Sequence, residues 1–223
     1  MTTLSHRLGQ FLRGLALVTL ATSAVAAFAQ TEPQAGRDYT VVSPAQATTD
    51  PKRIVVTEFF SYECPHCNAF SPSVMSWAAK LPKDVLFERV AVSVGHTVWV
   101  KPAQLFYTLQ AMGNLDQFDA AVFKAIHVDR APLTEDAGII EWATKQGIDR
   151  DKFIAAYNSF SVKSFQLRGD ALAKANRLPS VPTLVIDGKY MLPITDNGNF
   201  PAQLAVAQKL IDKARADKGS PSQ

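Results

Sequence analysis

The sequence predicts an α/β fold in which an all-helical segment interrupts a small sheet-containing domain, and three observations lead to this class. Two β-branched and aromatic runs, residues 54–60 and 85–92, flank a helical pattern, which is typical of a strand–helix–strand unit. Residues 97–176 contain only helical patterns, and a hairpin and a last helix follow them. The composition, 47% hydrophobic and 19% charged over 223 residues, is that of a globular protein with a sizeable core.

Residues 1–29 have the pattern of a secretory signal peptide. Two arginines precede an apolar run at residues 14–26, and alanines occupy the −3 and −1 positions before the predicted cleavage site in front of Gln30. An uncleaved membrane anchor is the alternative, but the run is shorter than the roughly 20 residues of a spanning helix. Cleavage lowers the formal net charge from +3 to +1 and predicts a soluble chain in an exported, oxidising compartment. Either charge is too small for the footprint of a nucleic-acid or anionic-membrane binder.

The first strands and the first helix follow in order. Residues 39–42 predict a short strand, and the nearly continuous apolar run 54–60 predicts a central strand buried on both faces, as in a parallel sheet. A helix is expected from Cys64-Pro65, because proline suits a first helical position. Pro72 falls inside this helix and should kink it, unless the helix ends early there. Residues 85–92 then complete a right-handed βαβ unit.

Five helices are predicted in the following segment, at residues 99–112, 115–127, 134–146, 149–158 and 161–176. Thr134, Asp149 and Ser161 are the expected N-caps, because their side-chain oxygens can accept hydrogen bonds from the first turn. Gly113 and Gly147 are the expected stops. This segment has the character of an insertion into the sheet-containing domain.

The last part of the chain predicts a hairpin and one helix. Residues 183–186 and 189–191 are separated by Asp187-Gly188, a dipeptide typical of a two-residue turn. Residues 200–217 carry apolar side chains at every third or fourth position, which is typical of a helix buried on one face. The polar tail at 218–223 is expected to fray.

Both cysteines of the chain lie in one motif, Cys64-Pro65-His66-Cys67, at a predicted strand-to-helix junction. Unpaired N–H groups and the helix dipole should lower the pKa of Cys64, and a protonated His66 would stabilise its thiolate further. Cys67 lies one turn later, close enough to form a disulfide with Cys64. Because only the reduced form gains from a stable thiolate, each unit by which the pKa falls makes the disulfide a stronger oxidant by about 1.4 kcal/mol, or about 30 mV.

Three other interpretations of the motif stay open beside redox exchange. A structural disulfide would close only a four-residue ring and would remove little entropy from the unfolded chain. A zinc site would need more ligands than Cys64, His66 and Cys67, and neither His96 nor His127 has ligand-like spacing. A cysteine hydrolase would leave Cys67 without a role. Redox exchange uses both sulfurs and needs neither a metal nor a prosthetic group.

The segment Phe59-Phe-Ser-Tyr-Glu-Cys-Pro-His-Cys67 resembles the active-site segment of the DsbA family, the periplasmic thiol–disulfide oxidases of the thioredoxin superfamily. Residues 157–164 resemble the helix that leads out of that family's inserted domain, and residues 180–190 resemble its cis-proline loop with the strand that follows. The resemblance covers the chain from Gly36 to the last helix. It implies a thioredoxin fold with an inserted all-helical domain. The implied division is a cleaved signal peptide at 1–29, a first thioredoxin part at 30–95, the inserted domain at 96–176, a second thioredoxin part at 177–217 and a flexible tail at 218–223.

The resemblance also implies roles for individual residues. Cys64 would carry the mixed disulfide with a substrate, and Cys67 would be the buried resolving sulfur. Pro65 and His66 would set the redox potential. Val181-Pro182, with a cis bond expected, would lie against the disulfide and bind an extended substrate; the alternative is an ordinary turn.

Two glutamates near the motif are further candidates. Glu58 interrupts the apolar strand, and a carboxylate there is unfavourable unless it is paired. The resemblance implies that it relays protons below the disulfide; alternatively, it reaches solvent or a lysine. Its basic partner is not evident, since Leu86 occupies the best-aligned position on the next strand and Arg89 is nearby. Glu63 directly precedes the motif, where a negative charge should oppose thiolate formation and weaken the oxidant.

The resemblance implies a monomeric periplasmic enzyme that oxidises reduced exported proteins and is itself reoxidised by a DsbB-like membrane quinone reductase. A disulfide isomerase or reductase of the same superfamily is the first alternative. Isomerases carry an N-terminal dimerisation module, for which the about 25 residues that separate Gln30 from Ile54 are too few. The second alternative is a non-enzymatic, peptide-binding chaperone that would not depend on Cys64.

Overall fold

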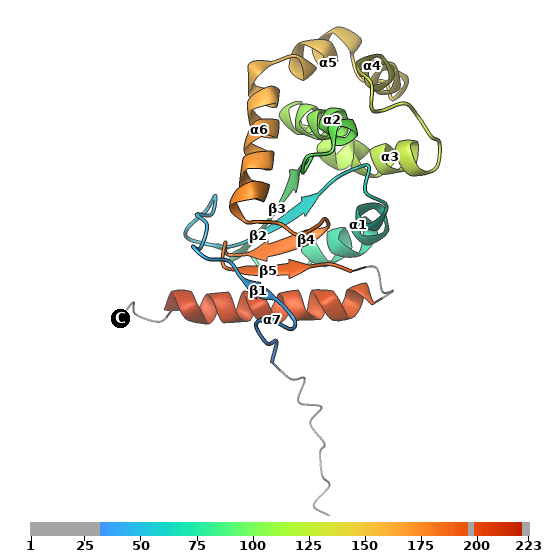
Figure 1. Ribbon diagram of the computed structural model, residues 1–223. Helices are drawn as coiled ribbons and strands as arrows, with labels where there is room; N and C mark the ends of the chain where they lie inside the picture. Colours follow the sequence, from blue (N-terminus) through green and yellow to red (C-terminus); the bar gives the residue numbers. More distant parts are fainter. Residues whose placement is uncertain (1–31, 196–198, 220–223) are drawn as a thin grey trace, which may run out of the picture. The chain divides into compact units, whose positions relative to one another are not determined.

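The computed structural model describes residues 32–195 and 199–219, so the predicted signal peptide at 1–29 lies outside the described residues (Figure 1). The described residues from Pro33 onward belong to one compact unit. No helix within the described ranges is long and apolar enough to cross a membrane.

Among the described residues, five strands form one mixed sheet in the order β1-β5-β4-β2-β3. The strands are β1 (Thr40–Val41), β2 (Ile54–Phe60), β3 (Val85–Ala91), β4 (Thr183–Ile186) and β5 (Tyr190–Pro193). The central strand β2 runs parallel to β3 and antiparallel to β4, so the expected parallel environment exists on one side only. Six of its seven residues are buried, which explains its nearly continuous apolar sequence. The register places Glu58 beside Arg89.

Two helices cover one face of the sheet. They are α1 (Pro65–Ala78) and α7 (Phe200–Gly219) (Figure 1). Their buried side chains, among them Phe70 and Leu210, share one apolar cluster with Val56, Leu184 and Leu192 of the strands. The predicted start of α1 is confirmed, and α1 continues through Pro72 to Ala78, so an early helix end at this proline is wrong.

The inserted helices lie on the other face of the sheet (Figure 1). After a short 3-10 turn, Thr97–Trp99, they are α2 (Val100–Ala111), α3 (Leu115–His127), α4 (Asp136–Lys145), α5 (Arg150–Tyr157) and α6 (Phe160–Ala175). Helix α6 approaches the sheet closely at Gly169, where an added Cβ would lie 2.3 Å from the Tyr107 hydroxyl. That hydroxyl donates a hydrogen bond of 2.9 Å to the Ala91 carbonyl, so Gly169 allows helix, tyrosine and strand to meet.

The structure confirms one of the three predicted N-caps. The Asp149 side chain accepts a hydrogen bond from the third residue of α5. Helix α6 begins earlier than predicted, and its N-cap is Ser159 rather than Ser161, because the Ser159 hydroxyl can reach the third residue of the helix. The prediction of Thr134 is also wrong, since Glu135 occupies the N-cap of α4 without a side-chain hydrogen bond.

The predicted hairpin joins β4 to β5. Asp187 and Gly188 both have positive φ, 52° and 64°, as an Asp-Gly turn requires. The Lys189 N–H closes the turn on the Ile186 carbonyl at 3.0 Å, so Lys189 belongs to the turn and β5 begins at Tyr190.

Candidate functional site

The two cysteines lie at the N-terminus of α1. Cys64 is the N-cap with extended backbone, φ −80° and ψ 118°, and Pro65 opens the helix. Both sulfurs are free thiols, and the residues are nearly covered, with 4% of Cys64 and 1% of Cys67 exposed. The strand β2 and the turn after it hold the motif in place, because the Cys64 N–H donates to the Ser61 carbonyl at 3.2 Å. A dithiol is therefore held at a helix N-terminus beside the end of the central strand.

The environments of the two sulfurs shift their pKa values in opposite directions, as thiol exchange requires. The Cys67 thiol donates a hydrogen bond to the Cys64 sulfur, and with the backbone N–H groups of Cys67 and His66 it lowers the pKa of Cys64 to about 6 against the effect of burial. The charge of His66 contributes least. Burial, followed by the hydrogen bond and the charge of Cys64, raises the pKa of Cys67. One sulfur is thus a thiolate at neutral pH, while the other keeps its proton.

The segment before β4 contacts the first sulfur. The Val181–Pro182 peptide bond is cis, and both residues are buried. The Cys64 sulfur lies 3.4 Å from the Val181 carbonyl oxygen, and its protonated form can donate a hydrogen bond to that oxygen. The Ile194 N–H donates to the Pro182 carbonyl at 3.0 Å, which fixes the loop against the sequence that follows β5. The interpretation of Pro182 as an ordinary turn is therefore wrong.

Glu58 lies in a buried ionic cluster. None of its surface is exposed, and its Oε2 accepts a hydrogen bond of 2.7 Å from Nε of Arg89. Nη1 of Arg89 lies 2.7 Å from Oδ1 of Asp119, which also accepts a hydrogen bond of 2.6 Å from the Tyr62 hydroxyl. Glu58 therefore reaches neither solvent nor a lysine. The basic partner that the sequence left open is Arg89, because the register pairs Glu58 with Arg89 and Val55 with Leu86.

This cluster contains two carboxylates for one guanidinium. Burial raises the pKa of Glu58, the Arg89 charge opposes that rise, and the Asp119 charge adds to it. The Glu58 charge in turn contributes to the raised pKa of Cys67. Oε1 of Glu58 and Nη2 of Arg89 have no partner among the described residues. The arrangement gives Glu58 a proton affinity above that of an ordinary glutamate, close enough to Cys67 to influence its ionisation.

Sequence reasoning missed Asp119 and Tyr62. The signal for Asp119 was present, because it lies on the buried face of α3 between Phe118 and Val122, where a carboxylate requires a partner.

Glu63 is half-buried and burial raises its pKa, while the His127 charge lowers it. Nε2 of His127 lies 2.7 Å from the Tyr62 carbonyl oxygen. Within the described part of the chain, no three His, Cys, Asp or Glu side chains gather in a way that could hold a metal ion.

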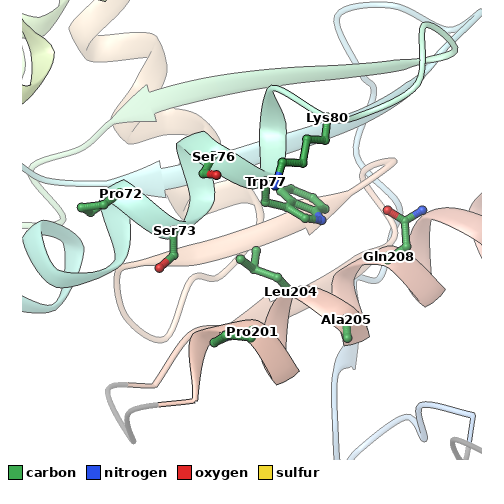
Figure 2. Close-up of a pocket in the computed structure, with 9 residues that line it drawn as sticks. All are labelled: Pro72, Ser73, Ser76, Trp77, Lys80, Pro201, Leu204, Ala205 and Gln208. Atoms are coloured by element: carbon green, nitrogen blue, oxygen red, sulfur yellow. The ribbon is translucent and has the colours of Figure 1, made fainter.

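A hollow of about 680 Å³ lies between α1 and α7 (Figure 2). Pro72 forms one end of it on α1, and Trp77 and Leu204 face each other across it. Its walls are mainly apolar, with Lys80 and Gln208 at the other end. The helix that begins at the dithiol thus also carries one wall of an open apolar surface.

The fold and this site together define a thiol:disulfide oxidoreductase of the thioredoxin type. The sequence matches the family described as "DSBA-like thioredoxin domain" over residues 87–204. It is 38% identical to the thiol:disulfide interchange protein DsbA of Azotobacter vinelandii over 209 residues, which are 94% of this chain and 97% of that protein. The crystal structure of Pseudomonas aeruginosa DsbA is similar with a TM-score of 0.80 and 36% identity, over 84% of this chain and 97% of that one. The chain belongs to the DsbA family.

Proposed function

We propose that this protein donates the Cys64–Cys67 disulfide to reduced proteins that have been newly exported to the periplasm. A substrate thiolate attacks Cys64, the Cys64–Cys67 bond breaks, and a mixed disulfide forms on Cys64. A second substrate thiolate then attacks the substrate sulfur of the mixed disulfide. The substrate leaves as a disulfide after losing two electrons, and the protein keeps both as a reduced dithiol.

The contrast in pKa between the two sulfurs carries this proposal. Cys64, with a pKa of about 6, is a good leaving group when the second substrate thiolate attacks. Cys67, with a raised pKa, takes up a proton when the disulfide opens. Glu58 can supply and recover that proton, because its own pKa is raised in the same buried environment. Pro65 and His66 act through the backbone and charge around Cys64.

The position of the cis-proline loop supports its role as the binding site for the substrate. Val181 presents its carbonyl oxygen to the Cys64 sulfur, so a polypeptide bound along Val181-Pro182 would bring its own sulfur to the reacting atom. Extended peptides bind such edges through main-chain hydrogen bonds, which tolerate many sequences. This suits an enzyme that oxidises many different proteins.

The proposal also covers the export of the protein, its domains and its reoxidation. Residues 1–29 act as the signal peptide, residues 96–176 form the inserted helical domain between the two thioredoxin parts 30–95 and 177–217, and the mature protein works as a monomer. A DsbB-like membrane quinone reductase restores the disulfide by accepting two electrons. The chain needs no cofactor beyond its own disulfide, and a charge beside Cys64 from Glu63 moderates its oxidising strength.

Two measurements test the proposal. Equilibration of Cys64–Cys67 with glutathione gives the reduction potential, and a value well above that of thioredoxin, about −270 mV, is expected for an oxidase. A value near −270 mV would favour the reductase alternative. Replacement of Cys64 by serine should abolish oxidation of a dithiol peptide, whereas Cys67→Ser should accumulate mixed disulfides. A C64S variant that still oxidises the peptide at the wild-type rate would overturn the mechanism. A wild type that oxidises no peptide but binds peptides as well as C64S does would favour the chaperone alternative.

A further inference from the structure

A second hollow, of about 430 Å³, lies where α6 ends and the linker to β4 begins. One wall is the last turn of α6 with Lys174 and Arg177, and the other is the loop Ser93–Gly95 that follows β3. Asp170 joins the two walls, because its carboxylate accepts hydrogen bonds of 2.7 Å from both the N–H and the hydroxyl of Ser93. The hollow is therefore built on a fixed frame.

The hollow is lined by two positive charges, Lys174 and Arg177, and one negative charge, Asp170, so its net charge is positive. Lys174 and Arg177 are exposed, and neither pairs with a carboxylate of the described residues. Asp170 is the one acid among the residues that line the hollow, and its oxygens are engaged by the Ser93 loop. Some lysines elsewhere on the helices do find partners, such as Lys145 with Glu141 at 2.6 Å. The two free cations leave this hollow complementary to an acidic group.

The backbone at Arg177 indicates that its side chain is retained at a cost in stability. Arg177 follows the C-cap of α6 with φ 52°, a left-handed conformation. The residues in the same position after α2 and α4 are Gly113 and Gly147, as this conformation favours. A positive charge near a helix C-terminus is favourable, but Lys174 already supplies one in the last turn. The helix geometry therefore does not explain an arginine where glycine is preferred.

The hollow is within reach of a polypeptide at the reacting sulfur. Arg177 precedes Val181 by four residues, a stretch that spans at most about 14 Å. The linker that holds both residues leads from α6 directly into β4 (Figure 1). Because an extended chain advances about 3.3 Å per residue, a substrate side chain two to four residues from the cysteine at Cys64 can reach Lys174 and Arg177.

We propose that Lys174 and Arg177 form a subsite for the carboxylate of an aspartate or glutamate two to four residues from the reacting cysteine of a partner polypeptide. The inference rests on the proposed function, because it places the partner's cysteine at Cys64. It makes the enzyme selective through a local charge, although the net charge of the chain is only +3.

The test compares two dithiol peptides that differ only by aspartate or asparagine three residues from the first cysteine. The oxidised protein reacts with each peptide, and the second-order rate constants are measured in quenched-flow samples. Wild type should oxidise the aspartate peptide about three to ten times faster at low salt, since each exposed ion pair contributes a factor of up to about five. The ratio should fall toward one at about 1 M salt, because ions screen exposed charges.

Variants separate the subsite from general effects. In the double variant Lys174→Gln/Arg177→Gln the ratio of the two rates should be close to one, whereas the control Lys145→Gln should keep the wild-type ratio. Arg177→Gly should lower the ratio and yet raise the urea midpoint, since glycine relieves the left-handed backbone. Equal rates for both peptides in wild type, or a ratio that survives in the double variant, would overturn the subsite. If wild type oxidises neither peptide, the proposed function itself has failed.

Discussion

Replacing Arg89 by methionine should strongly destabilise the protein. The Arg89 side chain is 6% exposed and lies 2.7 Å from both Glu58 and Asp119. Its guanidinium also lies 3.9 Å from the centre of the Phe60 ring. Removing one partner of a buried ion pair costs about 3–5 kcal/mol, since the remaining charge stays buried. For a protein of this size that loss corresponds to a melting temperature lower by about 6–20 °C.

The loss of stability in Arg89→Met should depend on pH, and the buried carboxylate that Arg89 leaves behind determines the direction of that dependence. Without Arg89, nothing opposes the rise in the pKa of Glu58 that burial causes, so the folded variant favours protonated Glu58 and binds more protons than its unfolded chain. Stability then falls as the pH rises above about 4, the ordinary range of carboxyl pKa values. The difference between wild type and Arg89→Met should therefore be larger at pH 8 than at pH 5. Urea unfolding of the reduced proteins, followed by tryptophan fluorescence, measures both differences.

Two further variants decide whether the reasoning is right. Arg53→Met removes an arginine from an exposed ion pair with Asp50, and it should cost less than about 1 kcal/mol. In Arg89→Met/Glu58→Gln/Asp119→Asn no charge is left buried alone, so this triple variant should recover part of the stability. A loss in Arg89→Met as small as that in Arg53→Met, or a triple variant less stable than the single one, would refute the charge argument.

Three other predictions concern the thiols and the helices. At pH 8 reduced protein should resist urea better than oxidised protein, and this advantage should shrink by pH 5. The reason is that the pKa of Cys64 is lowered to about 6, so the stabilisation that is fully present above the ordinary pKa of 9.0 is lost as the pH falls through 6. A more stable oxidised form at pH 8 would contradict this prediction. Ser159→Ala should lower the free energy of unfolding by about 0.5–2 kcal/mol, while Ser161→Ala should change it by less than about 0.5 kcal/mol, and equal losses would contradict the assigned N-cap. Gly169→Ala should cost about 1–3 kcal/mol in urea unfolding, because its Cβ would overlap the Tyr107 hydroxyl, and an unchanged midpoint would show that the tyrosine can move away.

Local patterns predicted most of the elements correctly. The apolar run of β2, the proline after Cys64 and the glycines after α2 and α4 each determine the structure of their own neighbourhood. The start of α6 was misjudged because Ser159 and Ser161 can both cap a helix. Choosing between them depends on where α6 must begin to pack against α2, which is a tertiary constraint.

The ionic cluster could be predicted only in part, for a different reason. The cost of burying Glu58 indicated that a partner exists, but its identity depends on the strand register. A shift of three residues separates Leu86 from Arg89 on the same strand, and no local pattern distinguishes the two. Asp119 comes from α3, more than fifty residues away from Glu58, so only the fold brings these carboxylates together.

The inserted helices also determine when the reacting site can exist. About 90 residues separate the end of β3 from the start of β4, and both strands flank β2. At a synthesis rate of about 5–20 residues per second, β4 is made roughly 5–20 s after β3. Until then one edge of the apolar strand β2 lacks its neighbour, and Cys64 lacks the Val181 carbonyl. An incomplete chain thus carries both sulfurs without the cis-proline loop that contacts Cys64. The complete site can form only after the chain has been synthesised through β4.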